Sequence, residues 1–214
     1  MKPLIGILLR PDQNSTGRDV EILYKSIKEV ILSKGGVPLG FTLPHQREVT
    51  EEEKEDLYRV LSACNGVLLQ GGEDFYPYDI ETVKFLYEKD IPTLGICLGM
   101  QTMAAALQGK MIDLENEKHM QKGIDFVHSV QIDPTSHLFQ IVKEEKFLVN
   151  SRHKSCVEST NLEVVGRSDD GLIEAVEDKN KKFFVGVQWH PEDLFTYDTV
   201  ASALFEAFIS ACTR

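Results

Sequence analysis

The sequence predicts an α/β fold with three layers: a mostly parallel central sheet with helices on both faces, and an added small antiparallel layer. Short apolar runs rich in β-branched residues alternate with segments of helical periodicity, as in chains that build parallel sheets. In the second half, strand-like runs follow one another with polar turns between them, which favours antiparallel pairing. No internal repeat or long linker divides the chain, so we expect a single domain over residues 1–214.

The first half supplies the alternating elements. Apolar runs predict strands, and apolar positions three and four residues apart predict helices. The strands are expected at 4–9, 37–43, 66–70 and 91–96, and the helices at 20–31, 51–61, 79–90 and 98–108, with a polar loop at 11–16.

The second half supplies the antiparallel strands and a final helix. Strands are expected at 127–132, 147–149, 162–165, 173–176 and 183–187. The tail at 196–211 carries apolar residues at helical spacing, so we expect it to dock on the core. Because an amphipathic helix can also form a subunit face, a homodimer stays open.

Charge and hydropathy narrow the classes of partner. Lys and Arg number 23 and Asp and Glu 34, which gives a net charge of −11 that repels phosphate backbones and anionic lipid surfaces. We therefore expect a small-molecule substrate, with no nucleic-acid partner and no membrane. The apolar run at 4–9 is too short for a bilayer span or a secretion signal, so we expect a cytoplasmic protein.

Cysteine and histidine spacing gives no sign of a metal site, a disulfide framework or a cofactor. His119, His128 and His137 are irregularly spaced and lack carboxylate company, so we expect them to be structural or exposed and predict no metal. The cysteines show no CxxC spacing, and a lone cysteine is usually a small buried apolar residue. They are Cys64, Cys97, Cys156 and Cys212.

Cys97 has surroundings that favour another role. Residues 95–99 read Gly-Ile-Cys-Leu-Gly, between a predicted strand and a predicted helix. Small neighbours permit the strained backbone of such a turn, which holds the side chain above the sheet edge. The helix N-terminus favours the thiolate over the thiol. Packing alone can also place glycines around a buried cysteine, so the turn needs a base to support a catalytic interpretation.

A base is available in Gln-Trp-His-Pro-Glu at 188–192. His190 follows an apolar strand, at the end where open α/β sheets place their sites. Glu192 is close enough in sequence to bind the second imidazole nitrogen and to stabilise the imidazolium. A strand-end histidine is more often structural, but in combination with the cysteine turn these residues predict a triad of Cys97, His190 and Glu192.

A glycine pair completes the predicted site. Gly71 and Gly72 follow the strand at 66–70 and let the backbone approach a substrate. The backbone N–H groups of these two glycines could join that of Leu98 in holding a developing oxyanion. An ordinary strand-end turn would give the same letters.

These segments give the chain a resemblance to the class I glutamine amidotransferase superfamily, and within it to the gamma-glutamyl hydrolases. The resemblance spans nearly the whole length and rests on GVLLQGGEDFYP, PTLGICLGMQ, HSVQID, LVNSRH, DDGLIEAVE and GVQWHPED. It implies a flavodoxin-like fold of the class I amidotransferase type. It also implies that Cys97 is the nucleophile, that His190 is the general base and acid, and that Glu192 orients the imidazole.

Further binding residues follow from the resemblance alone. Gln101 would match the family glutamine near the glutamyl group, and Asn150, Ser151 and His153 would face the glutamyl moiety. A strand-end turn would also account for the segment at 150–153. Lys154-Ser155 stands where this branch often has His-Gln, in a region where the leaving amine could be read.

The resulting prediction is a cofactor-free hydrolase that cleaves the gamma-glutamyl amide of a small amine or peptide through a cysteine thioester and releases glutamate. Two alternatives stay open. One is a glutaminase subunit that passes ammonia to a partner synthase. The other is a non-catalytic sensor or chaperone-like protein on the same fold, in which the cysteine responds to oxidation but the QWHPE sequence is not required.

Overall fold

A mixed sheet of eleven strands forms the centre of the molecule in a computed structural model that describes residues 1–42, 48–115 and 117–213. Five parallel strands come first across the sheet, in the order β4 (Val37–Phe41), β1 (Leu4–Leu8), β5 (Gly66–Leu69), β6 (Thr93–Ile96) and β13 (Phe184–Val187). The sheet continues with antiparallel strands, in the order β12 (Ile173–Glu177), β11 (Glu163–Ser168), β8 (His128–Ile132) and β9 (Lys146–Val149). Two further strands, β10 (Ser155–Ser159) and β7 (Lys110–Asp113), pair beside β12.

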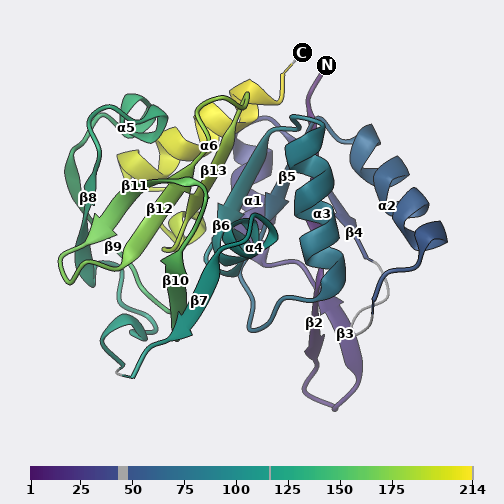
Figure 1. The fold of residues 1–214 in the computed structure, drawn as a ribbon, viewed down its shortest axis with the longest axis horizontal. Coiled ribbons are helices and arrows are strands. Elements are labelled where there is room, and N and C mark those ends of the chain that lie inside the picture. The colour runs from purple at the N-terminus through teal and green to yellow at the C-terminus, as the bar shows by residue number, and fades with distance from the viewer. Residues whose placement is uncertain (43–47, 116, 214) are drawn as a thin grey trace.

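Helices cover both faces of the sheet (Figure 1). One face carries α1 (Lys25–Ser33), α5 (His137–Val142) and α6 (Thr199–Ala211), and the other carries α2 (Glu51–Ala63), α3 (Pro77–Glu88) and α4 (Leu98–Ala106). Side chains alternate between the two cores as a pleated strand requires: along β5, Leu68 packs with the first set of helices, and Val67 and Leu69 pack with the second. The predicted α/β fold class is therefore confirmed, and the tail helix α6 docks on the core as expected.

The structure adds detail to the expected elements. The antiparallel strands expected in the second half join the main sheet through the pairing of β12 with β13. The short elements α5, β7 and β10 were not foreseen. The C-terminal end of the strand expected at 37–43 falls partly on residue 43, which lies outside the described residues.

Residues 10–22 form a hairpin where a polar loop and the start of a helix were expected. Strands β2 (Arg10–Gln13) and β3 (Asp19–Ile22) pair in a separate two-stranded sheet, and α1 begins only at Lys25. Burial alternates along β3 with the period of a strand, which the helical interpretation of Val20 missed. The Asn14 side chain accepts the N–H groups of Thr16 and Arg18 and so closes the turn locally.

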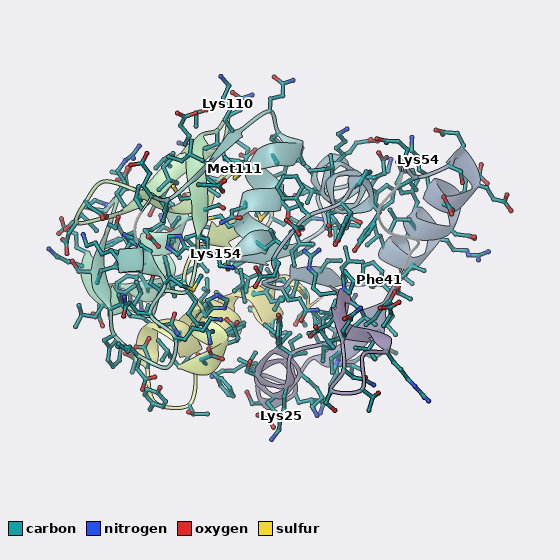
Figure 2. All side chains as sticks on the ribbon, turned by 90° about the horizontal axis from the view of Figure 1, so that it is seen from below. Lys25, Phe41, Lys54, Lys110, Met111 and Lys154 are labelled. Atoms are coloured by element: carbon teal, nitrogen blue, oxygen red, sulfur yellow. The ribbon has the colours of Figure 1, made fainter. Side chains whose placement is uncertain are left out.

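The order of the strands positions the candidate site. Strands β5, β6 and β13 are neighbours and run parallel, so their carboxyl ends meet at one edge of the sheet. In Figure 1, β1 runs from the N-terminus toward the β2–β3 hairpin, so this is the lower edge, onto which Figure 2 looks. Within the part of the chain that the structure describes, none of the helices is both long and apolar enough to cross a membrane.

Candidate active site

Cys97 occupies the turn between β6 and α4 in a strained conformation. Its φ of 52° and ψ of −106° lie in a region that residues with a side chain rarely adopt, so the strained turn predicted from sequence is confirmed. The flanking glycines are required by packing. A Cβ on Gly99 would lie 2.1 Å from the carbonyl oxygen of Leu69, and one on Gly95 would lie 2.4 Å from the sulfur of Met103. Close approach of α4 to the sheet therefore fixes the turn at Cys97.

Gln188 contacts the sulfur of Cys97 and was not identified from the sequence. Its Nε2 lies 3.5 Å from Cys97 Sγ, and its Oε1 accepts a hydrogen bond of 3.1 Å from Gln101 Nε2. Gln188 therefore links the sulfur of Cys97 to Gln101 of α4. The only sequence signal was its place at the start of the QWHPE segment.

The other cysteines are in surroundings that keep them protonated. All four cysteines are free thiols in buried positions. Burial raises the pKa of Cys64, raises that of Cys156 to about 11 and raises that of Cys212 to about 12. These three residues fit the expectation of small buried side chains.

His190 is held from several sides. Its Nδ1 lies 2.8 Å from Glu192 Oε1, which leaves Nε2 for the reacting groups. Burial by itself lowers the pKa of His190, but the charge of Glu192, together with the charge of Cys97 and a hydrogen bond to it, raises that pKa to about 10. The site therefore favours the imidazolium form of His190 at neutral pH.

Gly71 and Gly72 bring the loop after β5 into contact with His190 and with Leu98. A Cβ on Gly71 would lie 3.0 Å from His190 Cε1, and one on Gly72 would lie 2.9 Å from Leu98 Cδ2. Leu98 is the first residue of α4, where backbone N–H groups lack acceptors within the helix. The loops that follow β5, β6 and β13 thus converge around Cys97.

Two cavities meet at Cys97. The first, of about 290 Å³, is bounded by residues that include His190, Glu192 and Tyr24. The second, of about 450 Å³, is bounded by residues that include Gln101 and His153. The linings share Gly72, Glu73, Cys97 and Arg152. The thiol therefore lies between two spaces, one on the side of the imidazole and one on the side of α4.

The residues expected to face the glutamyl moiety have protein partners instead. Asn150 holds the backbone of His190: its Oδ1 accepts from the His190 N–H at 2.8 Å and its Nδ2 donates to the His190 carbonyl at 2.9 Å. Ser151 Oγ donates to the carbonyl of His119 at 2.9 Å. Gln101 lines the second cavity, but its Nε2 is used by Gln188 and by the Ser155 carbonyl. Asn150 and Ser151 therefore have partners within the protein, and their contact with the glutamyl moiety stays a prediction.

His153 belongs to a second histidine group. It lies with His119, His128 and Glu174, all buried, and the potential ligand atoms of the four residues are within 4.8 Å of one another. The expectation of no metal rested on a lack of carboxylate company, and that premise is wrong for His119 and His128. The third histidine considered there, His137, lies apart on α5 with its ring edge against Phe183.

Arg10 is a further residue near the site without a sequence signal. It is buried and forms an ion pair of 2.8 Å with Asp79 of α3. A Cβ on Gly72 would lie 3.3 Å from Arg10 Cδ, so the side chain of Arg10 packs against the glycine loop. Its role depends on the contact between the start of β2 and α3, which the sequence pattern does not reveal.

Comparisons with known proteins agree with this arrangement. The gamma-glutamyl-gamma-aminobutyrate hydrolase PuuD of Escherichia coli K12 is 30% identical over 244 aligned positions, covering 98% of this chain and 93% of that protein. A GMP synthase (glutamine-hydrolyzing) of Francisella tularensis is 34% identical over 136 positions, covering 62% of this chain and 25% of that protein. The crystal structure of a glutamine amidotransferase from Thermotoga maritima has the same fold, with a TM-score of 0.67 at 15% identity and full coverage of both chains.

A family model locates the match on the candidate site. The Peptidase C26 model matches residues 78–192, a span that includes Cys97, His190 and Glu192. With the full-length similarity, this match identifies a cysteine-dependent hydrolase of the glutamine amidotransferase-like kind. The chain belongs to the Peptidase C26 family.

Proposed function

We propose that this protein hydrolyses the γ-glutamyl amide bond of a small γ-glutamyl compound through a thioester at Cys97. One observation carries the proposal: Cys97, Gly72 and His190 follow three adjacent parallel strands and meet where two cavities join. The names of the relatives support the same bond, since the Escherichia coli protein is called a gamma-glutamyl-gamma-aminobutyrate hydrolase.

In the first half of the proposed reaction, the Cys97 thiolate adds to the γ-carbonyl carbon. The backbone N–H groups of Gly72 and Leu98 stabilise the negative charge that develops on the carbonyl oxygen. The bond from carbon to nitrogen then breaks, and His190 Nε2 gives its proton to the departing amine. Glu192, bonded to Nδ1 at 2.8 Å, keeps the imidazole in the orientation that this transfer requires.

In the second half, water replaces the amine. The now neutral His190 takes a proton from the water as its oxygen attacks the thioester carbon. The bond from carbon to sulfur breaks, glutamate leaves, and the thiolate and imidazolium are restored. Because the imidazolium is favoured in the resting site, the same pair is ready for the next substrate.

The charges of the two cavities support a placement of the substrate. A glutamyl group carries both an α-ammonium and an α-carboxylate, and the second cavity offers partners for both signs. Its charged lining residues are Glu73, Asp74, Asp113, Arg152 and Lys154. The first cavity is lined by His190, the proposed proton donor, so the leaving amine belongs there. Lys154 would then contact the glutamyl head and not the amine.

The proposal is tested by incubating the pure protein with a panel of γ-glutamyl amides and measuring released glutamate by mass spectrometry. The matched controls are the corresponding α-glutamyl amides. In these compounds the amine is attached to the α-carboxyl group, and the γ-carboxylate is free. We expect glutamate only from γ-linked compounds. Equal release from both series, or release from neither, would contradict the proposal.

A second function is favoured by the similarity to the Francisella synthase over 62% of this chain. In that case the protein would be a glutaminase subunit that hands ammonia to a partner synthase. Such a subunit should hydrolyse glutamine slowly alone and should not cleave larger γ-glutamyl amines. Turnover of γ-glutamyl amines by the isolated chain therefore separates the two functions.

A further inference from the structure

A group of three histidines and a glutamate lies within the antiparallel half of the molecule, apart from the proposed chemistry. Glu174 is on β12 and His128 is on β8, while His119 ends a short 3₁₀ turn and His153 lies in the loop before β10. The carboxylate Oε1 lies 3.6 Å from His128 Nε2, 3.6 Å from His153 Nε2 and 3.8 Å from His119 Nδ1. Elements from distant parts of the chain thus direct four ligand atoms to one point.

In each of the three histidine rings, the outer nitrogen, the one that faces away from Glu174, lies within hydrogen-bond distance of an oxygen atom. His119 Nε2 lies 3.0 Å from Asp170 Oδ2, His153 Nδ1 lies 3.1 Å from the Ser155 carbonyl, and His128 Nδ1 lies 3.3 Å from the Ser129 carbonyl. Since a carbonyl can only accept, these contacts place the proton on the outer nitrogen. The inner nitrogens then present lone pairs, with Ser151 Oγ at 3.3 Å from His119 Nδ1 as a neighbour.

Lone pairs and a carboxylate facing one another require a cation between them. Glu174 is fully buried and neither of its oxygens has a hydrogen-bond partner, and the inner nitrogens of His128 and His153 also have none. A buried carboxylate without donors is costly. We propose that these four residues bind one divalent first-row transition metal ion in a closed structural site, for which Zn²⁺ is the probe.

The spacing fits such an ion. Ligands held at about 2.0–2.1 Å around tetrahedral zinc are about 3.3 Å apart. The three separations from Glu174 Oε1, 3.6 to 3.8 Å, are longer than hydrogen bonds and within a few tenths of an ångström of that edge, and all four ligand atoms lie within 4.8 Å of one another. Imidazole nitrogens with one carboxylate suit zinc and its neighbours more than magnesium or calcium. Asp170 behind His119 gives the carboxylate–histidine–metal arrangement that orients ligands.

The cluster borders a surface cavity on one side and is linked to the cavity beside Cys97 on the other. A surface cavity lined by Lys118, Gln121, Ile124, Phe126, Val127 and His128 borders one member of the cluster, His128. On the inner side, the Ser155 carbonyl that His153 contacts also accepts from Gln101. The ion would therefore hold the loop at 150–154, which walls the cavity beside Cys97.

The test uses the full chain carrying Cys97→Ala, so that the proposed nucleophile cannot bind the probe and no result depends on the proposed function. After treatment with a chelator, the protein is dialysed against Zn²⁺ and its metal content is measured by mass spectrometry. We expect one zinc per chain, a higher Tm with zinc, and a tetrahedral Co²⁺ spectrum when cobalt replaces it. X-ray absorption on this unaltered ligand set should show only nitrogen and oxygen ligands at about 2.0 Å.

Variants assign the ligands. Glu174→Gln and His128→Gln should lose the bound zinc, whereas the matched control His137→Gln should keep it. Asp170→Asn leaves every ligand in place and should weaken zinc affinity by about 10–100-fold. The proposal is overturned if the protein with all four ligands retains no more zinc than Glu174→Gln does, or if sulfur appears among the ligands. Because those measurements include the unaltered ligand set, a variant that fails to fold does not decide the outcome.

Discussion

Histidine and glutamate occur together in two regions of this molecule, with opposite consequences for the proton. At the sheet edge, Glu192 bonds directly to His190 Nδ1 at 2.8 Å, and the charges of Glu192 and Cys97 overcome burial to raise the pKa of His190. In the buried group, Glu174 stays 3.8 Å from His119 Nδ1, and burial lowers the pKa of His119, although Asp170 raises it. A carboxylate holds one nitrogen of each ring, so the balance between burial and the other neighbouring charges decides the direction in which the pKa moves.

The largest expected effect comes from the nucleophile, which only the first region contains. Cys97→Ala should reduce γ-glutamyl hydrolysis by at least about four powers of ten, because no other group can form the thioester. The zinc content of the second region should not change. Cys64→Ala, which removes a buried thiol elsewhere, is the control and should remain active. An active Cys97→Ala enzyme would refute the mechanism.

The next experiment replaces each of the two glutamates, Glu192 and Glu174, separately by glutamine. Glu192→Gln should lower kcat by about two to four powers of ten, since the imidazole loses the charge that stabilises its protonated form. It should bind zinc as the wild type does. Glu174→Gln should show the reverse pattern, with zinc lost and kcat changed far less. If both variants lose activity equally, the distinction between the regions fails.

Substitution of Asn150 tests whether this residue positions His190 or binds the substrate. Asn150→Ala removes both hydrogen bonds to the His190 backbone, so we expect kcat to fall by about 10–100-fold while KM changes little. A substrate contact would instead raise KM. Asn150→Asp keeps the acceptor for the His190 N–H and should retain more activity than the alanine variant. A dominant rise in KM would restore the role that the family resemblance implied.

The smallest effect concerns stability against pH. The pKa of His190 in the folded protein, about 10, lies above its ordinary value of 6.5, so its imidazolium stabilises the fold fully below pH 6.5. That contribution is lost as pH rises toward 10. The difference in free energy of unfolding between wild type and His190→Gln, measured in urea, should therefore shrink from pH 6.5 to pH 10. A His190→Gln difference that stays constant over this range would argue against the raised pKa.

Local sequence patterns were sufficient for the parallel half of the fold and the centre of the candidate site. The turn at Cys97 and the glycines beside it follow from short-range sterics, which is why a strand, a Gly-x-Cys-x-Gly turn and a helix could be predicted together. The hairpin at 10–22 was missed because Val20 fits helical spacing with Leu23 and Tyr24 as well as strand alternation with Ile22. Cytoplasmic location and a homodimer stay predictions.

The sequence by itself determined the α/β class, the Cys97 turn and the His190–Glu192 pair, because each is encoded within a few neighbouring residues. Only the tertiary structure decided that Asn150 holds His190 and that three histidines converge on Glu174. Those contacts depend on which strands become neighbours and on how the loops between them close, and long-range pairing leaves no periodic mark on the segments that it joins.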